Sequence, residues 1–262
     1  MKIASFNING IKARIGQLTA WLSEAQPDVV VLQEIKTVDE GFPAEMIEDL
    51  GWKVWTHGQK SWNGVAVLSR LPVEEIRRGL PGDDADEQAR YIEAVVMGDR
   101  HAVTVAGLYL PNGNPAPGPK YDYKLAWMDR LRQRGAELLA TEQPVVMLGD
   151  YNVIPEPRDA ARPENWVDDA LFLPESRAAF RRIVNQGWTD AIRVTDPHAT
   201  RGPFTFWDYQ RQAWERDNGI RIDHLLLSPQ AADLMRGAGI DRDQRAGVKP
   251  SDHVPVWVDL AA

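Results

Sequence analysis

Pro144-Val145-Val146-Met147-Leu148 is followed directly by Gly149-Asp150-Tyr151-Asn152, so an apolar run ends in a carboxylate and an amide two residues apart. An uninterrupted apolar run is typical of a strand covered on both faces, and Val29-Val30-Val31-Leu32 has the same character. Strands of this kind need a layer on each side, which indicates an α/β architecture. Alternation along an extended backbone predicts that Asp150 and Asn152 point the same way, toward a metal ion or a phosphate.

Short apolar patterns predict further strands along the chain, and helical patterns fall between several of them. The strands are expected at 2–7, 28–33, 53–57, 64–69, 91–97, 102–109, 144–149, 222–227 and 254–259. Helices are expected at 13–25, 43–50, 120–141, 174–186 and 229–235. Because the strands at 64–69, 91–97 and 102–109 have only loops between them, we expect mixed sheets rather than purely parallel ones.

Three long polar or Pro/Gly-rich segments, at 111–119, 155–165 and 207–221, lie between these elements. Long loops in compact domains often carry function. No flexible linker or low-complexity tract divides the chain, so we expect one domain over residues 1–262.

The composition restricts the chemistry. The 262 residues are 44% apolar, enough for a sizeable core, and include no cysteine, which excludes disulfides and thiolate metal sites. A metal must be bound by carboxylate, amide or imidazole groups, which favour Mg²⁺, Mn²⁺ or Ca²⁺ over zinc. The net charge of −8 counts modestly against a nucleic-acid partner, although a local basic face can bind phosphate on an acidic protein.

The hydropathy pattern gives no sign of a membrane or of export. No run approaches the ~20 apolar residues that a membrane span needs. Residues 1–7 enter a strand pattern at once, without the regions of a secretion signal. A cytoplasmic protein with no membrane partner is the expectation.

Polar residues stand at three further strand ends. Asn7 follows one predicted strand, Glu34 follows another, and Asp252-His253 precedes the last one. Taken alone, each of these residues is also explained by ordinary turn chemistry or by a surface charge, without any functional role. Together with Asp150 they are the candidates for a metal-dependent phosphate site.

Asp223 enters the very apolar segment Ile222–Leu227 and would be costly to bury without a partner. A histidine could supply that partner and would have its tautomer fixed by the pairing. A strand cap or a salt bridge with Arg221 is the other interpretation, and the residues alone leave both open.

Taken in order, eight segments resemble motifs of the exonuclease III family of abasic-site DNA endonucleases, within the endonuclease/exonuclease/phosphatase superfamily. These segments are Lys2–Gly10, Leu32–Lys36, Gly64–Ser69, Tyr109–Gly113, Gly149–Asn152, Thr205–Tyr209, Gly219–Asp223 and Ser251–Pro255. Each is weakly specific, but all of them in this order over nearly the whole chain are very specific. The resemblance implies an α/β (α+β type) four-layer sandwich of two mixed β-sheets flanked by helices, the deoxyribonuclease-I-like fold.

The resemblance also implies a metal centre. Asn7 and Glu34 resemble its metal-binding pair, with Asp252 nearby and Glu34 as the central ligand. Mg²⁺ is the implied ion, with Mn²⁺ as a substitute. A divalent ion would offset the charge that develops on the phosphate oxygens during hydrolysis.

Five residues resemble the family's catalytic groups. Tyr109 resembles the tyrosine near the scissile phosphate, and Asp150 the residue that positions or deprotonates the attacking water. Asn152 resembles the amide that binds a phosphate oxygen and holds Asp150. Asp223 and His253 resemble the carboxylate–imidazole pair at the phosphate. The sequence leaves open whether Asp150 or His253 takes the proton from water.

Other matching residues are implied to contact the substrate. Asn112 resembles a phosphate contact, and Phe206, Trp207, Ile220 and Ile222 resemble the apolar walls that receive a flipped-out, base-less deoxyribose. Ile220 stands where some relatives carry tryptophan, which implies a shallower pocket. The basic candidates for the DNA backbone are Lys36 and Arg14, with Lys12, Lys120, Lys124 and Arg201, and the aromatic ones are Trp166 and Trp214.

The implied function is a Mg²⁺-dependent DNA repair nuclease, acting as a nucleoid-associated monomer on duplex DNA with abasic sites or blocked 3′ ends. It would cut 5′ to abasic sites and remove 3′-blocking groups, with 3′→5′ exonuclease action as an open addition. Because the same core serves other phosphoesterases, a phosphoinositide or sphingomyelin phosphoesterase is the alternative. A non-enzymatic DNA-binding scaffold is a third hypothesis, although such a protein is expected to have lost Glu34, Asp150 or His253.

Overall fold

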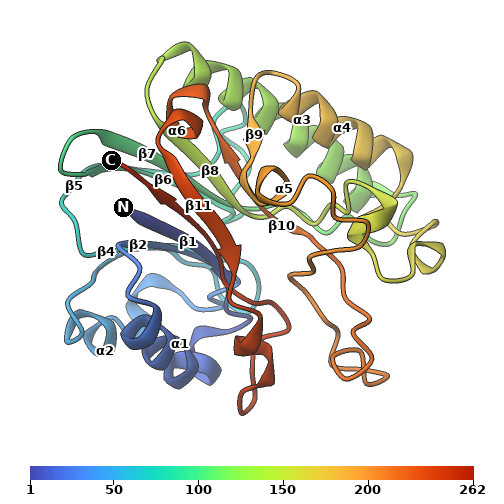
Figure 1. Ribbon diagram of the computed structural model, residues 1–262, viewed down its shortest axis with the longest axis horizontal. Coiled ribbons are helices and arrows are strands. Elements are labelled where there is room, and N and C mark those ends of the chain that lie inside the picture. The colour runs from blue at the N-terminus through green and yellow to red at the C-terminus, as the bar shows by residue number, and fades with distance from the viewer.

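The computed structural model describes all residues from Met1 to Ala262. They form two six-stranded β-sheets packed face to face, with helices on both outer sides (Figure 1). No helix is both long enough and apolar enough to cross a membrane.

The strands and helices have the following bounds. The first sheet contains β1 (Lys2–Asn7), β2 (Val29–Gln33), β3 (Lys53–His57), β4 (Val65–Ser69), β11 (Met235–Ile240) and β12 (Val256–Leu260). The second contains β5 (Val73–Arg78), β6 (Tyr91–Met97), β7 (Ala102–Tyr109), β8 (Val145–Asp150), β9 (Thr189–Asp190) and β10 (Asp223–Leu227). The helices are α1 (Ile11–Ala25), α2 (Glu45–Glu48), α3 (Pro119–Ala140), α4 (Pro174–Val184), α5 (Ala191–Thr195) and α6 (Pro229–Asp233).

Both sheets are mixed. Their strand orders are β11-β12-β1-β2-β4-β3 and β5-β6-β7-β8-β10-β9. Only the central pairs β1–β2 and β7–β8 are parallel, and the other neighbours are antiparallel. The prediction of two mixed sheets in a layered α/β fold is therefore confirmed.

Three apolar cores hold the layers together. One lies between the sheets and includes Val31 and Leu148, which explains why both strands are apolar along their whole length. The second joins the β8 sheet to α3 and α4 and includes Trp127. The third joins the β1 sheet to α1 and includes Trp21 and Leu22. Figure 1 shows these helices on opposite outer sides of the sandwich.

Gly149 allows β8 to run close to β7 directly before the polar motif. A Cβ atom at this position would lie 1.9 Å from the carbonyl oxygen of Leu108, a distance that no side chain can tolerate. The close approach brings Tyr109 and Asp150 opposite each other in the parallel register. The glycine before Asp150 is therefore required by the backbone that positions the site.

The sequence patterns missed β5, β9, β11 and α5, and some predicted ends were off by up to two residues. β5, β9 and β11 are edge strands. β5 exposes Glu and Arg side chains, as edge strands commonly do. β11 contains Gly239, over which the Trp257 ring packs so closely that a Cβ would lie 2.6 Å from it. The predicted helix at 43–50 shortens to Glu45–Glu48.

Candidate active site

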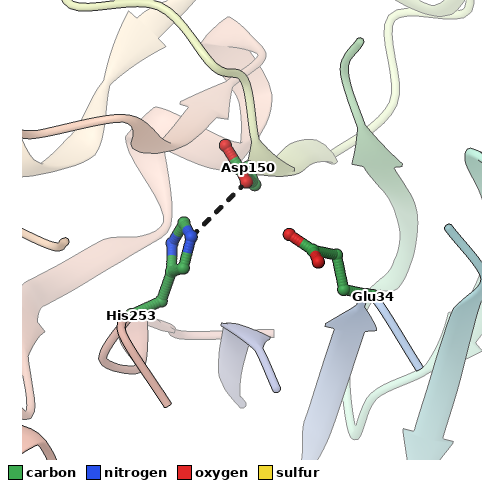
Figure 2. Close-up of side chains that lie close together, drawn as sticks. All are labelled: Glu34, Asp150 and His253. Carbon is green, nitrogen blue, oxygen red and sulfur yellow. Dashed lines mark ion pairs between the residues drawn. The ribbon is translucent and has the colours of Figure 1, made fainter. Parts of the chain in front are cut away.

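The polar strand ends meet at one edge of the sandwich, between the two sheets. β8 places Asp150 opposite Tyr109 of β7 and opposite Asp223 of β10. One carboxylate oxygen of Glu34, one of Asp150 and one ring nitrogen of His253 lie within 4.8 Å of one another (Figure 2). These residues are far apart in the sequence, so the fold itself creates the cluster.

Asn7 connects the two carboxylates of this cluster. Its Nδ2 donates to Oε1 of Glu34 at 2.9 Å and to Oδ2 of Asp150 at 3.0 Å. Its Oδ1 accepts from the backbone N–H of Asn9 at 3.0 Å. Asn7 thus lies beside Glu34, as expected, but here it presents its amino group to the cluster rather than a ligand oxygen.

Glu34 is held as a carboxylate by its surroundings. Its Oε2 lies 2.8 Å from the ammonium of Lys36. Burial alone would raise the pKa of Glu34, but Lys36 and then the amide of Asn7 outweigh burial and hold that pKa below its ordinary value. An ionised, largely enclosed carboxylate that already attracts a cation is a suitable ligand for a divalent metal ion.

Asp252 lies next to this cluster rather than within it. Its Oδ1 accepts from Nδ2 of Asn9 at 3.0 Å, while Lys36 Nζ donates to Oδ1 of the same Asn9. The nearby donors are carboxylates, an amide and an imidazole, with no thiolate anywhere in the chain. This donor set fits a hard divalent cation such as Mg²⁺ or Mn²⁺.

Asp150 and Asn152 are joined by a turn, not by a continuing strand. Asn152 has a φ of +46°, and its backbone N–H donates to Oδ1 of Asp150 at 2.9 Å. The side-chain Nδ2 of Asn152 donates to the carbonyl of Leu110 at 2.9 Å. The expectation of extended alternation was therefore wrong, because the Asp150 side chain closes an Asx turn.

Asp223 pairs with His253 across the site. Its Oδ2 lies 2.9 Å from Nδ1 of the imidazole, while the other ring nitrogen, Nε2, lies 3.7 Å from Oδ2 of Asp150. Burial alone would lower the pKa of His253, but the carboxylates of Asp223 and Asp150 outweigh burial and raise it to about 10. Burial raises the pKa of Asp150 to about 7, with His253 opposing that shift. The imidazole is therefore positively charged at neutral pH.

Tyr109 ends β7 beside this pair of groups. The guanidinium of Arg90 stacks over its ring at 4.9 Å. Burial, followed by the carboxylates of Glu34 and Asp150, raises the pKa of Tyr109 well above its ordinary value. The phenol consequently stays protonated and can donate a hydrogen bond.

The residues expected to form a deoxyribose pocket fall into two groups. Ile220 and Ile222 are 2% exposed and pack with Leu171, and Phe206 is half-buried against them. The Phe206 ring contacts the His253 ring edge-on, with 5.0 Å between centroids. Phe206 is thus in direct contact with the imidazole of the cluster.

Trp207 belongs to a different apolar cluster. Its side chain is fully buried, lies edge-on to Trp214 at 5.0 Å, and packs with Phe204. The expectation that Trp207 forms a pocket wall is wrong, because the chain turns between Phe206 and Trp207 and sends the second ring inward.

The basic candidates occupy different surroundings. Lys36 faces Glu34, and Nη2 of Arg14 donates to the hydroxyl of Tyr209 at 3.0 Å. Lys124 is fully buried, so the expectation that it is a surface cation for DNA was wrong. Lys12 and Lys120 are exposed.

One exposed aromatic side chain near the site was not predicted from the sequence. Trp62 is 72% exposed, and the neighbouring Asn63 accepts a backbone hydrogen bond from Lys36 at 3.1 Å. The signal was available in Ser61-Trp62-Asn63-Gly64, because an aromatic residue inside turn chemistry has no core to enter.

A buried ion-pair network was also not predicted from the sequence. Arg221 donates to Asp159 and to Asp190, at 2.8 Å in each case. Of the two interpretations of Asp223, the histidine partner holds, since Arg221 points away from it. No local signal could reveal partners separated from Arg221 by 62 and 31 residues.

Four non-glycine residues around the site have left-handed backbone conformations. They are Asn9, Glu34, Lys36 and Asn152, with φ values between +46° and +54°. Such conformations cost energy and persist where the surrounding structure holds them, commonly at functional sites.

Comparisons with known proteins place this site in context. The model of the endonuclease/exonuclease/phosphatase family matches residues 4–253. Exodeoxyribonuclease III of Haemophilus influenzae is 38% identical over 267 aligned positions, which cover 99% of this chain and all of that protein. An AP endonuclease structure from Archaeoglobus fulgidus superposes with a TM-score of 0.93 at 33% identity, covering both chains completely. The 3′ phosphatase NExo from Neisseria, bound to a product DNA hairpin, gives a TM-score of 0.94 at 34% identity with the same coverage.

Proposed function

The chain belongs to the endonuclease/exonuclease/phosphatase family as a nuclease related to exodeoxyribonuclease III and AP endonucleases, and from that premise we propose a specific activity. It is a Mg²⁺-dependent DNA repair nuclease that hydrolyses the phosphodiester 5′ to abasic sites in duplex DNA. It also removes 3′-phosphates and other 3′-blocking groups, and the same site would serve any 3′→5′ exonuclease action. The observation that carries the proposal is the convergence of Glu34, Asp150 and His253 within 4.8 Å.

Glu34, with Asn7 and Asp252, would hold the ion. When bound there, Mg²⁺ supplies positive charge to the phosphate oxygens and orients the group. For Asn7 to become a ligand, its amide has to turn so that the oxygen replaces the amino group now facing Glu34. Lys36, which pairs with Glu34, would be available for a DNA phosphate if a divalent cation took its place at that carboxylate.

Asp150 acts as the general base. The pKa of His253 is raised to about 10 by the carboxylates that outweigh its burial, so the imidazole already carries its proton and cannot accept another. Asp150, with a pKa raised to about 7 by burial, is poised near neutral pH to take a proton from water. A cation bound at Glu34 would favour the ionised form of Asp150.

The remaining groups stabilise charge on the phosphate. His253, fixed by Asp223 at 2.9 Å, offers a charged N–H from Nε2. Tyr109 and Asn112 add neutral donors. Asn152, whose backbone N–H holds the Asp150 turn, would offer its side-chain amide to a phosphate oxygen. These donors are preorganised by the fold, so they need no rearrangement as charge develops.

Substrate choice rests on Phe206, whose half-buried ring lies beside His253 and packs on the buried side chains of Ile220 and Ile222. A deoxyribose without its base fits such a surface after unstacking from the duplex. Trp62, Lys36 and Arg14 would contact the DNA backbone of a monomeric enzyme at the nucleoid. The relatives named above are DNA enzymes, and no feature of the site favours a phosphoinositide or sphingomyelin headgroup.

A substrate panel tests the proposal. Wild-type protein is incubated with a duplex carrying one abasic-site analogue, a duplex with a 3′-phosphate, and a water-soluble phosphoinositide, each with Mg²⁺ or with EDTA. We expect Mg²⁺-dependent incision 5′ to the lesion and release of the 3′-phosphate, with no turnover of the phosphoinositide. Cleavage that persists in EDTA, or preference for the phosphoinositide, rejects the assignment.

A further inference from the structure

Lys124 is a charged residue of α3, the long helix that covers the second sheet, and its side chain is entirely buried. It belongs to the inner face of α3, where Tyr121, Trp127 and Leu131 supply ordinary apolar packing. Its side chain is 0% exposed, and no carboxylate forms a salt bridge with it. A buried ammonium without a counter-ion is unfavourable compared with an apolar side chain of the same length. Packing alone therefore does not explain a lysine at this position.

The ammonium ends between two loops of the site. Nζ donates to the backbone carbonyl of Asn112 at 3.0 Å and to that of Asn152 at 2.6 Å. The first carbonyl lies in the turn that follows β7, and the second in the turn that follows β8. One side chain thus connects the two turns from the interior of the molecule.

The turn above Lys124 is shaped around its stem. Gly113 has a φ of +91°, and a Cβ atom there would lie 2.6 Å from Cδ of Lys124 and 3.2 Å from Cβ of Ala170. The turn can approach the helix this closely only because residue 113 has no side chain. The same stem therefore supports the turn sterically while the ammonium binds its carbonyl.

The connection reaches the reacting groups through Asn152. This residue holds its left-handed conformation with its carbonyl bound to Lys124 and its N–H donated to Oδ1 of Asp150. Nδ2 of Asn112 also lies 3.4 Å from Oδ1 of Asn152. The orientation of the Asp150 carboxylate and the spacing of the two amides thus depend on the same buried donor.

We propose that Lys124 is a positioning residue that fixes the turns carrying Asn112 and Asn152 relative to Asp150. The proposal rests on the function assigned above, because it takes the two amides and Asp150 as groups that act on the phosphate. Burial lowers the pKa of Lys124 to about 7, with Asp150 and Asp169 opposing that shift. The charged form of this lysine is therefore unfavourable at its buried position. Lys124 contacts no substrate in this role.

Lys124→Met tests the proposal, since methionine keeps the buried stem and removes the donors. Lys53→Met, on the exposed edge strand β3, is the matched control. With Mg²⁺ and abasic duplex, we expect kcat of Lys124→Met to fall by about 10²-fold, the usual effect of misplacing catalytic groups by an ångström. KM should change less than about threefold, and Lys124→Gln, which keeps N–H donors on a shorter stem, should recover part of kcat.

The salt dependence separates this role from a DNA contact. Loss of one phosphate contact lowers the slope of log affinity against log salt concentration by about 1. We expect that slope to be the same in Lys124→Met and wild type. A wild-type kcat in Lys124→Met, or a lower slope with an unchanged kcat, overturns the proposal.

Hydrogen exchange gives a readout independent of activity. Amides of segments 110–114 and 151–154 should exchange faster in Lys124→Met than in wild type, while the β1 sheet keeps its protection. Unchanged exchange in both segments overturns the proposal, even if the wild type proves inactive on abasic DNA and the assigned function fails. If Lys124→Met does not fold, the same exchange measurement is made on Lys124→Gln. Protection equal to that of wild type in both segments of this variant would count against the role.

Discussion

Oδ2 of Asp223 lies 2.9 Å from Nδ1 of His253, so the imidazole is oriented and kept charged by a buried carboxylate. The opposite ring nitrogen faces Asp150 at 3.7 Å. A charged donor is therefore held in place before any substrate arrives, which is the condition for efficient stabilisation of a phosphate in its transition state.

Asp223→Asn should remove that charge without changing the shape of the site. Because burial remains and the carboxylate that opposes it is lost, the pKa of His253 should fall from about 10. As pH is raised, the variant should therefore lose activity at a lower pH than wild type does. We expect kcat at pH 8 to fall by about 10²-fold or more. NMR titration of the His253 ring proton gives the pKa, with the surface variant Asp129→Asn as control. An unchanged pKa would show that Asp223 does not set the charge of the imidazole.

Glu34→Gln should weaken metal binding and leave the fold intact. The substitution keeps the hydrogen bond from Asn7 possible but removes the charge that attracts the cation. The half-saturating Mg²⁺ concentration should rise at least about 10-fold. Activity against Mg²⁺ concentration and Mn²⁺ binding by electron paramagnetic resonance measure this, with circular dichroism as the check on folding. Loss of the folded state would instead make Glu34 a structural residue.

Phe206→Ala should impair abasic incision more than release of a 3′-phosphate. The Phe206 ring lies against His253 and the Ile220 cluster, where a flipped deoxyribose would pack, whereas a terminal phosphate needs little of that surface. We expect kcat/KM for incision to fall roughly 10-fold more than for phosphate release, since lost apolar contact is worth about 1–3 kcal/mol. Equal losses on the two substrates would reject the pocket.

His224 should make folding stability depend on pH. Burial, followed by the charge of Arg221, lowers its pKa to about 4, and its Nε2 lies 3.0 Å from the carbonyl of Val153. Between pH 6.5 and about 4 the unfolded chain binds a proton that folded His224 does not, so stability falls as pH falls through this window. The full effect is up to about 3 kcal/mol.

Urea unfolding of wild type and His224→Gln from pH 7 to pH 4 isolates this effect. The variant is expected to be less stable at pH 7, because it loses aromatic contacts with Tyr151 and Phe180. Its stability should nevertheless decline less steeply toward pH 4. Parallel curves of unfolding free energy against pH for the two proteins would show that His224 does not cause the pH dependence.

The sequence predicted the elements whose patterns are strong and local. β2 and β8 were recognisable because both faces are covered, and their polar ends identified Glu34 and Asp150. The edge strands β5 and β11 were not recognisable, since exposed charges and glycines replace the apolar pattern there. Their positions are decided by neighbours distant in the chain.

Within the site, residue types were easier to predict than contacts. Trp207 and Lys124 are residue types common on DNA-binding surfaces, but both side chains are fully buried. The left-handed turn at Asn152 is equally invisible, because it is stabilised by Asp150 and by a lysine on another element. Such features follow from tertiary packing, which the local pattern does not contain.

We propose above that Asp150 takes the proton from the attacking water. Asp150→Asn, which keeps the size and most hydrogen bonds of the side chain, tests this role by single-turnover cleavage of an abasic duplex at saturating Mg²⁺. We expect a rate at least about 10³-fold below wild type, in line with loss of a general base, and a DNA dissociation constant within about fivefold of wild type. A cleavage rate within tenfold of the wild-type rate would show that Asp150 is not the general base.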